Sequence, residues 1–370
     1  MSTTSLTLAE CRALHDGLAG AMRARAEAIA ADLLTFDRRD TARIRSAVQA
    51  MDGDVRRFFA AVPQVMAAQA AAREAGAEAE GASPGRDSPD WARFIGAFGL
   101  TRVVVNRWQE VRALIERQAE VRRTALYRDW PAEGDPTATQ LAQVSLLLDD
   151  LRGVLNPAQQ DTDAHARGAF ADIALPHADF LAHLHAAYRL RLAQDLAGPT
   201  WFVDVGCGGG LKVLAAGQVF DRALGIELDP GYAAAAGRLL DGSRQSNCMI
   251  VVEDALAFEH YGEFGVIYFY RPLRRREDLA ALEARICEAA VPGTVLIVPY
   301  QAFAHRAEAL GCTRVAPSLY LAGRTAEEAA VLADRAEQTG PAIKPPIPTL
   351  FDIFEPIVKA SARRGHGLAL

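Results

Sequence analysis

The sequence predicts an α/β protein in which a mostly parallel sheet follows an all-helical N-terminal region. From residue 201 onward, short apolar runs alternate with helical segments, which is typical of a parallel sheet covered on both faces. Before residue 157 the chain contains no convincing strand and is rich in Ala, Arg and Glu. We therefore expect a helical domain over 1–157, a sheet domain over 158–340, and a proline-rich connector with a terminal helix over 341–370.

Length and composition agree with a two-domain protein. The chain has 370 residues, half of them hydrophobic, and a formal net charge of −6, which argues against a surface built wholly for nucleic acid but leaves a local basic patch open. Its five cysteines include no Cys-x-x-Cys pair, so neither a zinc site nor a disulfide framework is supported. The chain shows no signal segment and no run long enough to cross a bilayer, so we expect a reduced, cytoplasmic setting.

The N-terminal region reads as a set of amphipathic helices. Thr7-Leu-Ala-Glu10 is a capping box that opens a helix reaching about Leu34. Further helices are predicted over 41–51, 55–74, 103–127 and 139–155. Apolar residues at helical spacing indicate a buried bundle face rather than a ligand platform; they are Val104, Trp108, Val111 and Ile115.

The second half alternates strands and helices. Strands are predicted over 201–205, up to Glu227, over 248–252, 265–270 and 293–298, and in the run 314–321. Asp229-Pro230 is an N-cap followed by proline at the first helical position, so a helix opens there. Thr325-Ala-Glu-Glu328 is a second capping box and starts a further helix.

The most informative stretch joins the first two strands. The apolar run Trp201–Val205 leads into the glycine loop Gly206-Cys-Gly-Gly-Gly210, and the second strand ends in Glu227. Such a unit binds nucleotides, because the glycines let a ligand approach the backbone and the acid is placed to bind a ribose. A dinucleotide fingerprint requires glycine where this chain has Leu211. Asp204 at the loop would repel a pyrophosphate but suits a ligand with a positive amine or sulfonium.

The pattern Asp204-x-Gly206-x-Gly208-x-Gly210 resembles the first motif of class I S-adenosylmethionine (SAM) dependent methyltransferases. The resemblance implies a Rossmann-like class I methyltransferase sheet with an antiparallel edge, with SAM as the cofactor. The loop would hold the methionine half of SAM, and Glu227 would bind the ribose hydroxyls. The alternative is a strand-turn-helix that uses its glycines only for the turn. The cofactor-binding residues that the resemblance implies are Asp204, Gly206, Cys207, Gly208, Gly210, Glu227, Leu228, Asp254, Ala255 and Phe269.

Two of these residues have a second interpretation. In the family an acid after the third strand contacts the adenine amino group, and Asp254 with its neighbour Ala255 matches that position. Asp254 would equally serve as the cap of the next turn. Cys207 is a small, soft side chain within the glycine loop, and packing alone would explain it.

The segment before the first strand is a candidate lid. Pro176 breaks the chain ahead of a helix, and the resemblance implies that this helix covers the sheet while the residues before it close over SAM. Phe170, Leu175 and His177 are the candidates there, with a capping or surface role as the alternative for His177. His183 and His185 are two apart, whereas chelation from a helix favours four, so no metal site is expected.

Chemistry is expected at the end of the fourth strand, because ligands of open α/β sheets bind beyond the carboxyl ends of the strands. Many amino methyltransferases carry (Asn/Asp)-Pro-Pro-(Tyr/Phe) here, whereas this chain has Phe269-Tyr-Arg-Pro-Leu273. That departure puts N-methylation of bases or glutamine in doubt, and the chain is more similar to a loose group of bacterial class I methyltransferases. Tyr270 is the candidate to orient the acceptor, and Arg271 to attract a carboxylate, a phosphate or RNA. Arg274–Arg276 would start the next helix as a solvated face.

Two functions from different classes follow. The first is a SAM-dependent methyltransferase acting on an unidentified acceptor, which is a small molecule, a protein or RNA. The second is a non-catalytic SAM- or nucleotide-binding regulatory or structural protein. A nicotinamide oxidoreductase is disfavoured by Leu211 and by the lack of an evident hydride-transfer partner. The helical region would choose the substrate, bind a protein partner or form a homo-oligomer, and no membrane role is expected.

Overall fold

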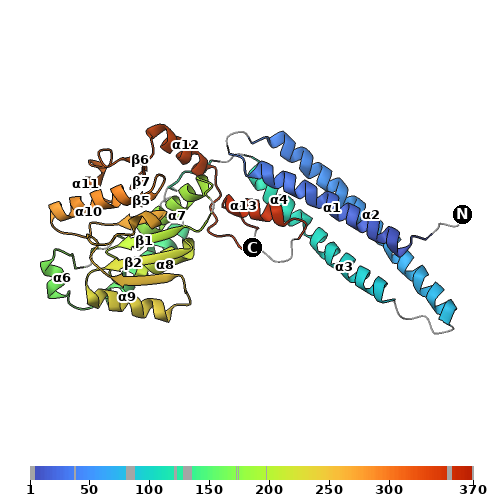
Figure 1. Cartoon of the computed structure of the whole chain (residues 1–370), viewed down its shortest axis with the longest axis horizontal. Helices are drawn as coiled ribbons and strands as arrows, with labels where there is room; N and C mark the ends of the chain where they lie inside the picture. Colours follow the sequence, from blue (N-terminus) through green and yellow to red (C-terminus); the bar gives the residue numbers. More distant parts are fainter. Residues whose placement is uncertain are drawn as a thin grey trace. The chain divides into compact units, whose positions relative to one another are not determined.

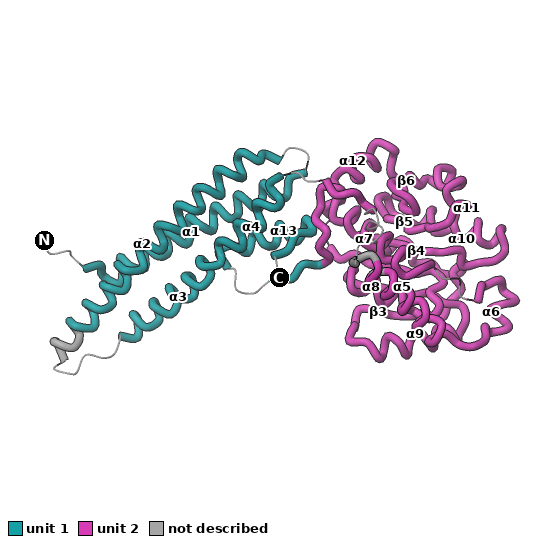
Figure 2. The backbone as a smooth tube through the Cα atoms, turned by 180° about the vertical axis from the view of Figure 1, so that it is seen from behind, with its two compact units in different colours: residues 1–122, 344–370 teal, residues 123–343 magenta. Residues whose placement is uncertain are grey.

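The chain folds into two compact units (Figure 2). Residues 1–122 and 344–370 form unit 1, and residues 123–343 form unit 2. The boundary therefore falls after Arg122 rather than after residue 157, and the C-terminal segment joins the first unit. The computed structural model describes residues 5–36, 39–80, 88–120, 123–127, 136–171, 173, 175–196, 198–347 and 352–368.

Unit 1 is a helical bundle built from both ends of the chain (Figure 1). Its helices are α1 (Leu8–Leu33), α2 (Thr41–Glu80), α3 (Pro89–Asn106), α4 (Trp108–Ala119) and α13 (Glu355–Arg363). The predicted stripe from Val104 to Ile115 is buried in its core. The ring of Phe354, just before α13, lies 5.3 Å from that of Trp108, and Gln118 donates to Ser361 Oγ at 2.8 Å. The terminal helix thus completes the bundle core, which explains why it belongs to unit 1.

Two helix boundaries in unit 1 differ from the prediction. α2 is continuous where the sequence predicts a break around Asp52-Gly-Asp54. Asp54 is fully buried, and its carboxylate accepts a hydrogen bond from Arg25 at 2.7 Å and pairs with Arg57. These tertiary contacts outweigh the weak helix propensity of Asp and Gly. Conversely, the helix predicted over 103–127 is interrupted at Arg107 and ends at Ala119.

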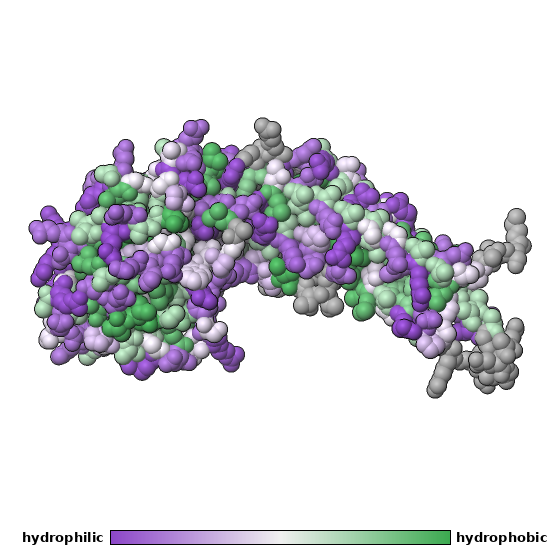
Figure 3. Space-filling model, viewed as in Figure 1, coloured by the Kyte–Doolittle hydropathy of each residue, from purple (hydrophilic) through white to green (hydrophobic). Residues whose placement is uncertain are grey.

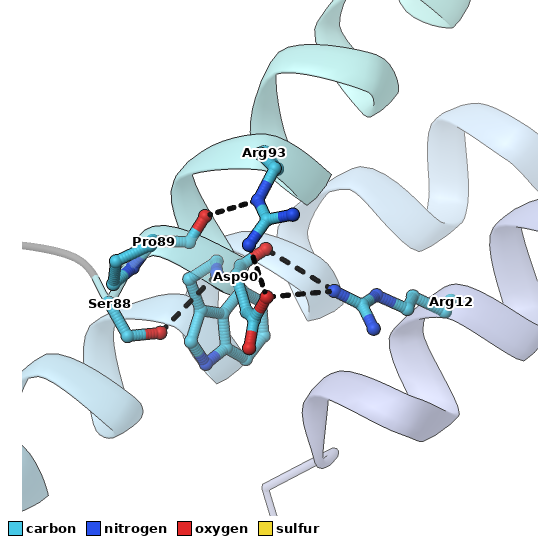
Figure 4. A network of polar contacts seen from close by, with 6 residues as sticks. Arg12, Ser88, Pro89, Asp90 and Arg93 are labelled. Atoms are coloured by element: carbon cyan, nitrogen blue, oxygen red, sulfur yellow. Dashed lines mark hydrogen bonds and ion pairs between the residues drawn. The ribbon is translucent and has the colours of Figure 1, made fainter.

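The start of α3 shows how local capping and tertiary contacts combine (Figure 4). Ser88 Oγ accepts a hydrogen bond from the amide of Trp91 at 3.4 Å, and Pro89 occupies the first turn. Asp90 pairs with Arg93 at 3.0 Å and lies 3.9 Å from the guanidinium of Arg12 on α1. A carboxylate at a helix N-terminus is favoured by the helix dipole, so these residues fix where α3 begins.

Unit 2 is a sheet with helices on both faces (Figure 1). Its strands are β1 (Trp201–Val205), β2 (Arg222–Glu227), β3 (Cys248–Val252), β4 (Val266–Phe269), β5 (Val295–Ile297), β6 (Cys312–Ala316) and β7 (Leu319–Ala322). Their order is β3-β2-β1-β4-β5-β7-β6. The first five are parallel, and β7 runs antiparallel to both β5 and β6. The predicted α/β fold, with its mostly parallel sheet and antiparallel edge, is confirmed.

The helices of unit 2 are α5 (Pro136–Leu155), α6 (Thr162–Ala166), α7 (His177–Ala193), α8 (Leu211–Val219), α9 (Pro230–Gly242), α10 (Arg276–Ala289), α11 (Gln301–Ala304) and α12 (Ala326–Glu337), with a 3₁₀ turn, η1, over Tyr261–Glu263. Several of them bury the two faces of the sheet. Alternate strand residues enter opposite cores: Phe202 packs with α7 and α8, whereas Val203 packs with α10. In the same way Tyr268 and Phe269 lie on opposite faces, as the sequence predicts.

Helix α5 belongs with the sheet because it supports α7. The amide of His177 donates to Asp149 Oδ1 at 3.1 Å, and the amide of Ala178 donates to Ser145 Oγ at 3.1 Å. Both acceptors lie on α5 and cap the first turn of α7. This is the physical reason why the division of the chain falls before α5.

The surface of both units is chemically mixed, with hydrophilic and hydrophobic residues interspersed over the face in view (Figure 3). On α4, for example, Arg112 pairs with Glu116 at 2.8 Å. Such alternating charges along a helix are typical of a solvated face. No helix within the described ranges combines the length and apolar character needed to cross a bilayer.

The second capping box provides a stability test for unit 2. Thr325 Oγ1 accepts from the amide of Glu328 at 3.2 Å, and the Glu328 carboxylate accepts from the amide of Thr325 at 2.9 Å. We expect Thr325→Ala to lower the free energy of unfolding by about 1 kcal/mol, because the first turn of α12 loses an acceptor. Urea unfolding followed by fluorescence measures it. Thr325→Ser keeps the hydroxyl and should remain close to wild type; equal losses in both variants would contradict the capping role.

Candidate functional site

The glycine loop between β1 and α8 has a backbone that few other residues could adopt. Gly206, Gly208 and Gly210 have φ values of 80°, 53° and 78°, in the left-handed region. Space is also limited: a Cβ on Gly210 would lie 2.7 Å from the Cβ of Ala236 on α9, and one on Gly206 would lie 2.9 Å from Pro272 Cβ. The loop therefore needs glycine both for its conformation and for close packing against the neighbouring elements.

Most amide groups of this loop already have protein acceptors. The amides of Gly206 and Cys207 donate to the carbonyl of Ile226 at 2.9 and 3.0 Å, and the amide of Gly210 donates to the carbonyl of Cys207 at 3.1 Å. The amide of Gly208 donates to Glu227 Oε2 at 2.8 Å. A dinucleotide pyrophosphate binds to such amides when they are free. Here a pyrophosphate would have to displace these acceptors, one of which is the Glu227 carboxylate, and this disfavours a phosphate ligand at the loop.

Glu227 connects the loop to the second strand. It is 8% exposed, and its other carboxylate oxygen accepts from the amide of Asp229 at 2.9 Å. Burial raises the pKa of Glu227, and the hydrogen bonds from Asp229 and Gly208 oppose that rise. Additional donors, such as the two hydroxyls of a ribose, would further stabilise the charged form. Asp204, the other acid of the motif, lies within β1 and is 2% exposed.

The position of Asp254, after β3, agrees with both roles considered for it, as a cap and as a binding residue. Asp254 Oδ1 accepts from the amide of Leu256 at 2.9 Å, so this carboxylate caps the following turn. Its other oxygen pairs with Arg167, which precedes α7 by ten residues in the chain. Asp254 and Ala255 also line the pocket described next, as a contact to adenine would require. The capping role and a binding role are therefore compatible.

A pocket opens where the first four strands end, across the point at which the strand order reverses between β1 and β4. Ligands of open α/β sheets bind at such switch points. Six of the predicted cofactor residues line it: Gly206, Gly208, Glu227, Leu228, Asp254 and Ala255. The two predicted catalytic residues, Tyr270 and Arg271, line it from the β4 side. Residues from four different loops are thus brought together at one edge of the sheet.

The remaining predicted cofactor residues lie outside the lining. Gly210 starts α8, and Asp204 is buried in its strand. Cys207 packs against Gly225, where an added Cβ would meet its sulfur at 2.6 Å, so the packing interpretation accounts for it. Phe269 points into the opposite core, where its ring lies 5.6 Å from that of Phe303. Strand alternation explains its position, because the side chain of Phe269 faces away from that of Tyr268.

Arg271 has an unusual conformation at the pocket. Its φ is 51°, in the left-handed region that a residue with a Cβ rarely adopts. The guanidinium lies 5.7 Å from the centroid of the Phe170 ring, within the range of a cation–π contact. Phe170 lines the same pocket, as expected for a lid residue, whereas the other candidates Leu175 and His177 are buried away from the lining.

The segment around Ala169, next to the candidate lid residue Phe170, covers one side of the pocket. Ala169 forms an isolated antiparallel bridge with Leu273, and Arg274 donates from its amide to the carbonyl of Gly168 at 2.8 Å. The Arg274 side chain also contacts His165 at 3.0 Å. Arg274 was expected to lie on a solvated helix face; instead it ties the loop after β4 to the segment before α7. Hydrogen-bonding partners more than a hundred residues away in the chain decided this, and no local pattern signals them.

The histidines of α7 have structural partners. His183 contacts the hydroxyl of Tyr127 at 2.8 Å, and His185 contacts the carbonyl of Pro341 at 3.0 Å. Across the described residues, no three His, Cys, Asp or Glu side chains gather in a way that could hold a metal ion.

Comparison with known proteins gives partial likenesses. No family model matches the chain. A protein of Methanothermobacter thermautotrophicus, described only as uncharacterized, is 39% identical over 74 residues, which cover 20% of this chain and 28% of that protein. The chain therefore matches little more than a quarter of that relative.

Solved structures give similarly partial matches. The sugar N-methyltransferase KedS8 from Streptoalloteichus is 22% identical, with 40% of this chain and 56% of that chain covered, at a TM-score of 0.28. The N-methyltransferase NodS from Bradyrhizobium japonicum is 18% identical, with 39% and 93% covered, at a TM-score of 0.28. An RNA methyltransferase from Salinibacter ruber, in complex with S-adenosyl-L-homocysteine, is 20% identical, with 34% and 76% covered, at a TM-score of 0.28.

The fold is decided by the strand order of the sheet itself. Five parallel strands in the order β3-β2-β1-β4-β5 are followed by the antiparallel strand β7 and the edge strand β6. Unit 2 therefore has the mostly parallel α/β sheet with an antiparallel edge that the resemblance of the glycine motif implies. The glycine loop and Glu227 lie at the ends of the first two strands, and Tyr270 and Arg271 follow the fourth.

The buried carboxyl group of Glu227 predicts a pH-dependent effect on stability. With a pKa raised above 4.5, the carboxyl group contributes most to stability when protonated, and this contribution is lost as the pH rises through the raised pKa. Glu227→Gln cannot ionise. The unfolding free energy of the variant minus that of wild type should therefore increase from acidic to neutral pH. Denaturant titrations at several pH values measure it.

The matched control is Glu259→Gln, at an exposed position of the same unit. It removes one negative charge without removing a buried carboxylate. A lost hydrogen bond at position 227 would shift the whole curve without changing its slope. A slope equal to that of the control would contradict a raised pKa for Glu227.

Proposed function

We propose that this protein is a SAM-dependent methyltransferase whose pocket at the carboxyl ends of the strands binds SAM. The observation that carries the proposal is the pairing of the glycine loop with Glu227. Glu227 accepts from the Gly208 amide at 2.8 Å, so the loop is formed around a carboxylate rather than left open for a phosphate. A carboxylate at the end of β2 is suited to ribose hydroxyls, and it suits a ligand without a pyrophosphate.

The residues present fit the parts of SAM. Glu227 would accept hydrogen bonds from the ribose, and Leu228 beside it offers an apolar surface. Asp254 and Ala255 lie at the adjacent strand end, where they would contact adenine. Gly206 and Gly208 let the methionine portion approach the backbone, because they lack a side chain.

Methyl transfer requires mainly alignment from the protein. When bound, SAM supplies an activated methyl group: the acceptor's lone pair forms the new bond to the methyl carbon, the carbon–sulfur bond breaks with its electron pair going to sulfur, and the acceptor's proton passes to water. Tyr270 and Arg271 would orient the acceptor, because both line the pocket beyond β4. Phe170 and the segment tied to Arg274 would exclude water from one side.

The motif after β4 limits the range of methyl acceptors that we propose. The sequence Tyr270-Arg271-Pro272 has no Asn or Asp to accept the protons of an amide or a nucleobase amine. We therefore disfavour those acceptors. The helical unit 1 would serve acceptor choice, a protein partner or homo-oligomerisation. All five cysteines are free thiols, which fits a reducing compartment such as the cytoplasm.

Binding is the first test of the proposal. Calorimetry should show that the protein binds SAM and S-adenosylhomocysteine but not NAD. Glu227→Gln should weaken SAM binding by about tenfold or more, because a hydrogen bond to a charged acceptor contributes about 1.5–3 kcal/mol. Glu263→Gln, which removes an exposed carboxylate at η1, is the matched control and should bind SAM normally. Failure of the intact protein to bind SAM or S-adenosylhomocysteine would rule the proposal out.

A methyl-transfer assay distinguishes a methyltransferase from a non-catalytic SAM-binding protein. Incubation with methyl-labelled SAM and an extract of the source cells should give a labelled product and S-adenosylhomocysteine. Tight SAM binding without any labelled product would instead support a non-catalytic SAM-binding protein.

A further inference from the structure

A second pocket lies beyond the end of β5. It is enclosed by the loop after β5, by α11, and by the hairpin of β6 and β7. Its polar lining comes from Tyr300, Gln301, His305, Arg314, Ser318 and Tyr320. Because β4 and β5 are adjacent and parallel, their carboxyl ends meet at the same edge of the sheet. The second pocket therefore adjoins the proposed SAM pocket.

Two tyrosines stand between the pockets. Tyr270 lines the first and Tyr300 lines the second, and their ring centroids are 6.5 Å apart. Tyr300 is held in place, since its hydroxyl donates to Glu283 at 2.7 Å. An acceptor seated in the second pocket would thus extend past Tyr300 toward Tyr270.

The acid that holds Tyr300 is neutralised. Glu283 is fully buried, and its two oxygens accept from the Arg306 guanidinium at 2.6 and 2.6 Å. Such a two-point pair satisfies the carboxylate and cancels its charge locally. None of the described residues that line the pocket is an Asp or Glu. The pocket is therefore not negative despite the nearby Glu283.

Arg314 gives the pocket a positive charge. Within the part of the chain that the structure describes, its guanidinium forms no ion pair, and the residue is exposed. It lies directly across from Tyr320 in the β6–β7 ladder, so both side chains share a face. Burial raises the pKa of the Tyr320 hydroxyl, and the Arg314 charge opposes the rise, which agrees with their proximity. A guanidinium without a carboxylate partner is suited to an oxyanion.

The position of Arg314 is fixed by an irregular hairpin. The register of β6 against β7 shifts between Arg314 and Ala316, as in a β-bulge, and bulges redirect side chains near binding sites. Ser318 in the turn has φ 64°, and its carbonyl accepts from the amide of Val298 at 2.8 Å. The carbonyl of Pro317 accepts from the Tyr127 hydroxyl at 2.6 Å. Left-handed residues held by several contacts concentrate at functional sites, and Arg271 and Ser318 each line one of the two pockets.

We propose that the second pocket binds the oxyanion of a small methyl acceptor, a carboxylate or a phosphate, with Arg314 as its main cationic contact. The inference rests on the proposed methyltransferase function and names the substrate class of that site. His305 and the Ser318 hydroxyl would add hydrogen bonds to the same group. The far end of the acceptor would then reach the first pocket beside Tyr270.

The test uses methyl-labelled SAM and the small-molecule fraction of a cell extract, separated on an anion exchanger. Labelled product should arise from the retained, anionic fraction. Arg314→Gln should raise the amount of this fraction needed for half-maximal labelling by about tenfold to one-hundredfold, with the SAM dissociation constant unchanged. Arg314→Lys keeps the charge and should recover part of the loss. Arg244→Gln, at an exposed arginine of the same unit outside both pockets, should behave as wild type.

The two sources of the oxyanion are separated by treating the fraction with alkaline phosphatase before labelling. Loss of labelling identifies a phosphate monoester, and unchanged labelling excludes a phosphate monoester and favours a carboxylate. Label in the unretained fraction, in protein or in RNA, or an unchanged half-maximal amount in Arg314→Gln, would overturn the anion site while leaving the methyltransferase in place. No labelled product from any fraction would overturn the proposed function and the anion site with it.

Discussion

The hydrogen bonds of Glu227 organise the candidate site. One carboxylate oxygen accepts from Gly208 in the first loop, and the other accepts from Asp229 at the start of α9. Asp229 in turn caps α9 and accepts from the amide of Asp161 at 2.8 Å. Glu227, together with the buried Asp229, thus connects the glycine loop, a helix and the segment before α7. Removing a carboxylate from water is costly, and these donors offset part of the cost. The loop conformation, and with it the shape of the pocket, depends on this network.

A second buried acid plays the corresponding part at the end of β5. Glu283, on α10, holds Tyr300 and Arg306, which flank the short helix α11. Breaking one member of such a buried pair leaves an uncompensated charge, so the arrangement specifies one geometry. The two acids therefore support the two pockets, one at the ends of the first four strands and one beyond the end of β5. Neither acid needs to react for the site to depend on it.

The sequence predicted the parts of the site that depend on local chemistry. The glycine loop, the mostly parallel sheet with its antiparallel edge, both capping boxes and the pocket positions of Glu227, Asp254 and Tyr270 follow from residue types at fixed spacings. Phe269, which the resemblance groups with the cofactor-binding residues, lies in the core opposite to that of Tyr268, as strand alternation requires. Contacts between distant segments were not predictable. Arg274 with His165 and Arg167 with Asp254 join residues 109 and 87 positions apart, and charge patterning alone favours a solvated face for such arginines.

Contacts between distant segments also explain why the domain boundaries differ from those predicted from the sequence. A helix such as α5 or α13 shows its apolar face in the sequence, but the face does not say which core it enters. For α5 the decision lies in Asp149 and Ser145, which cap α7. For α13 it lies in Phe354 and Ser361, which enter the core around Trp108 and Gln118. For α5 the deciding contacts are hydrogen bonds, and for α13 they combine a hydrogen bond with a ring contact. Such contacts between distant segments choose the core that a helix enters, and the hydrophobic pattern alone does not name them.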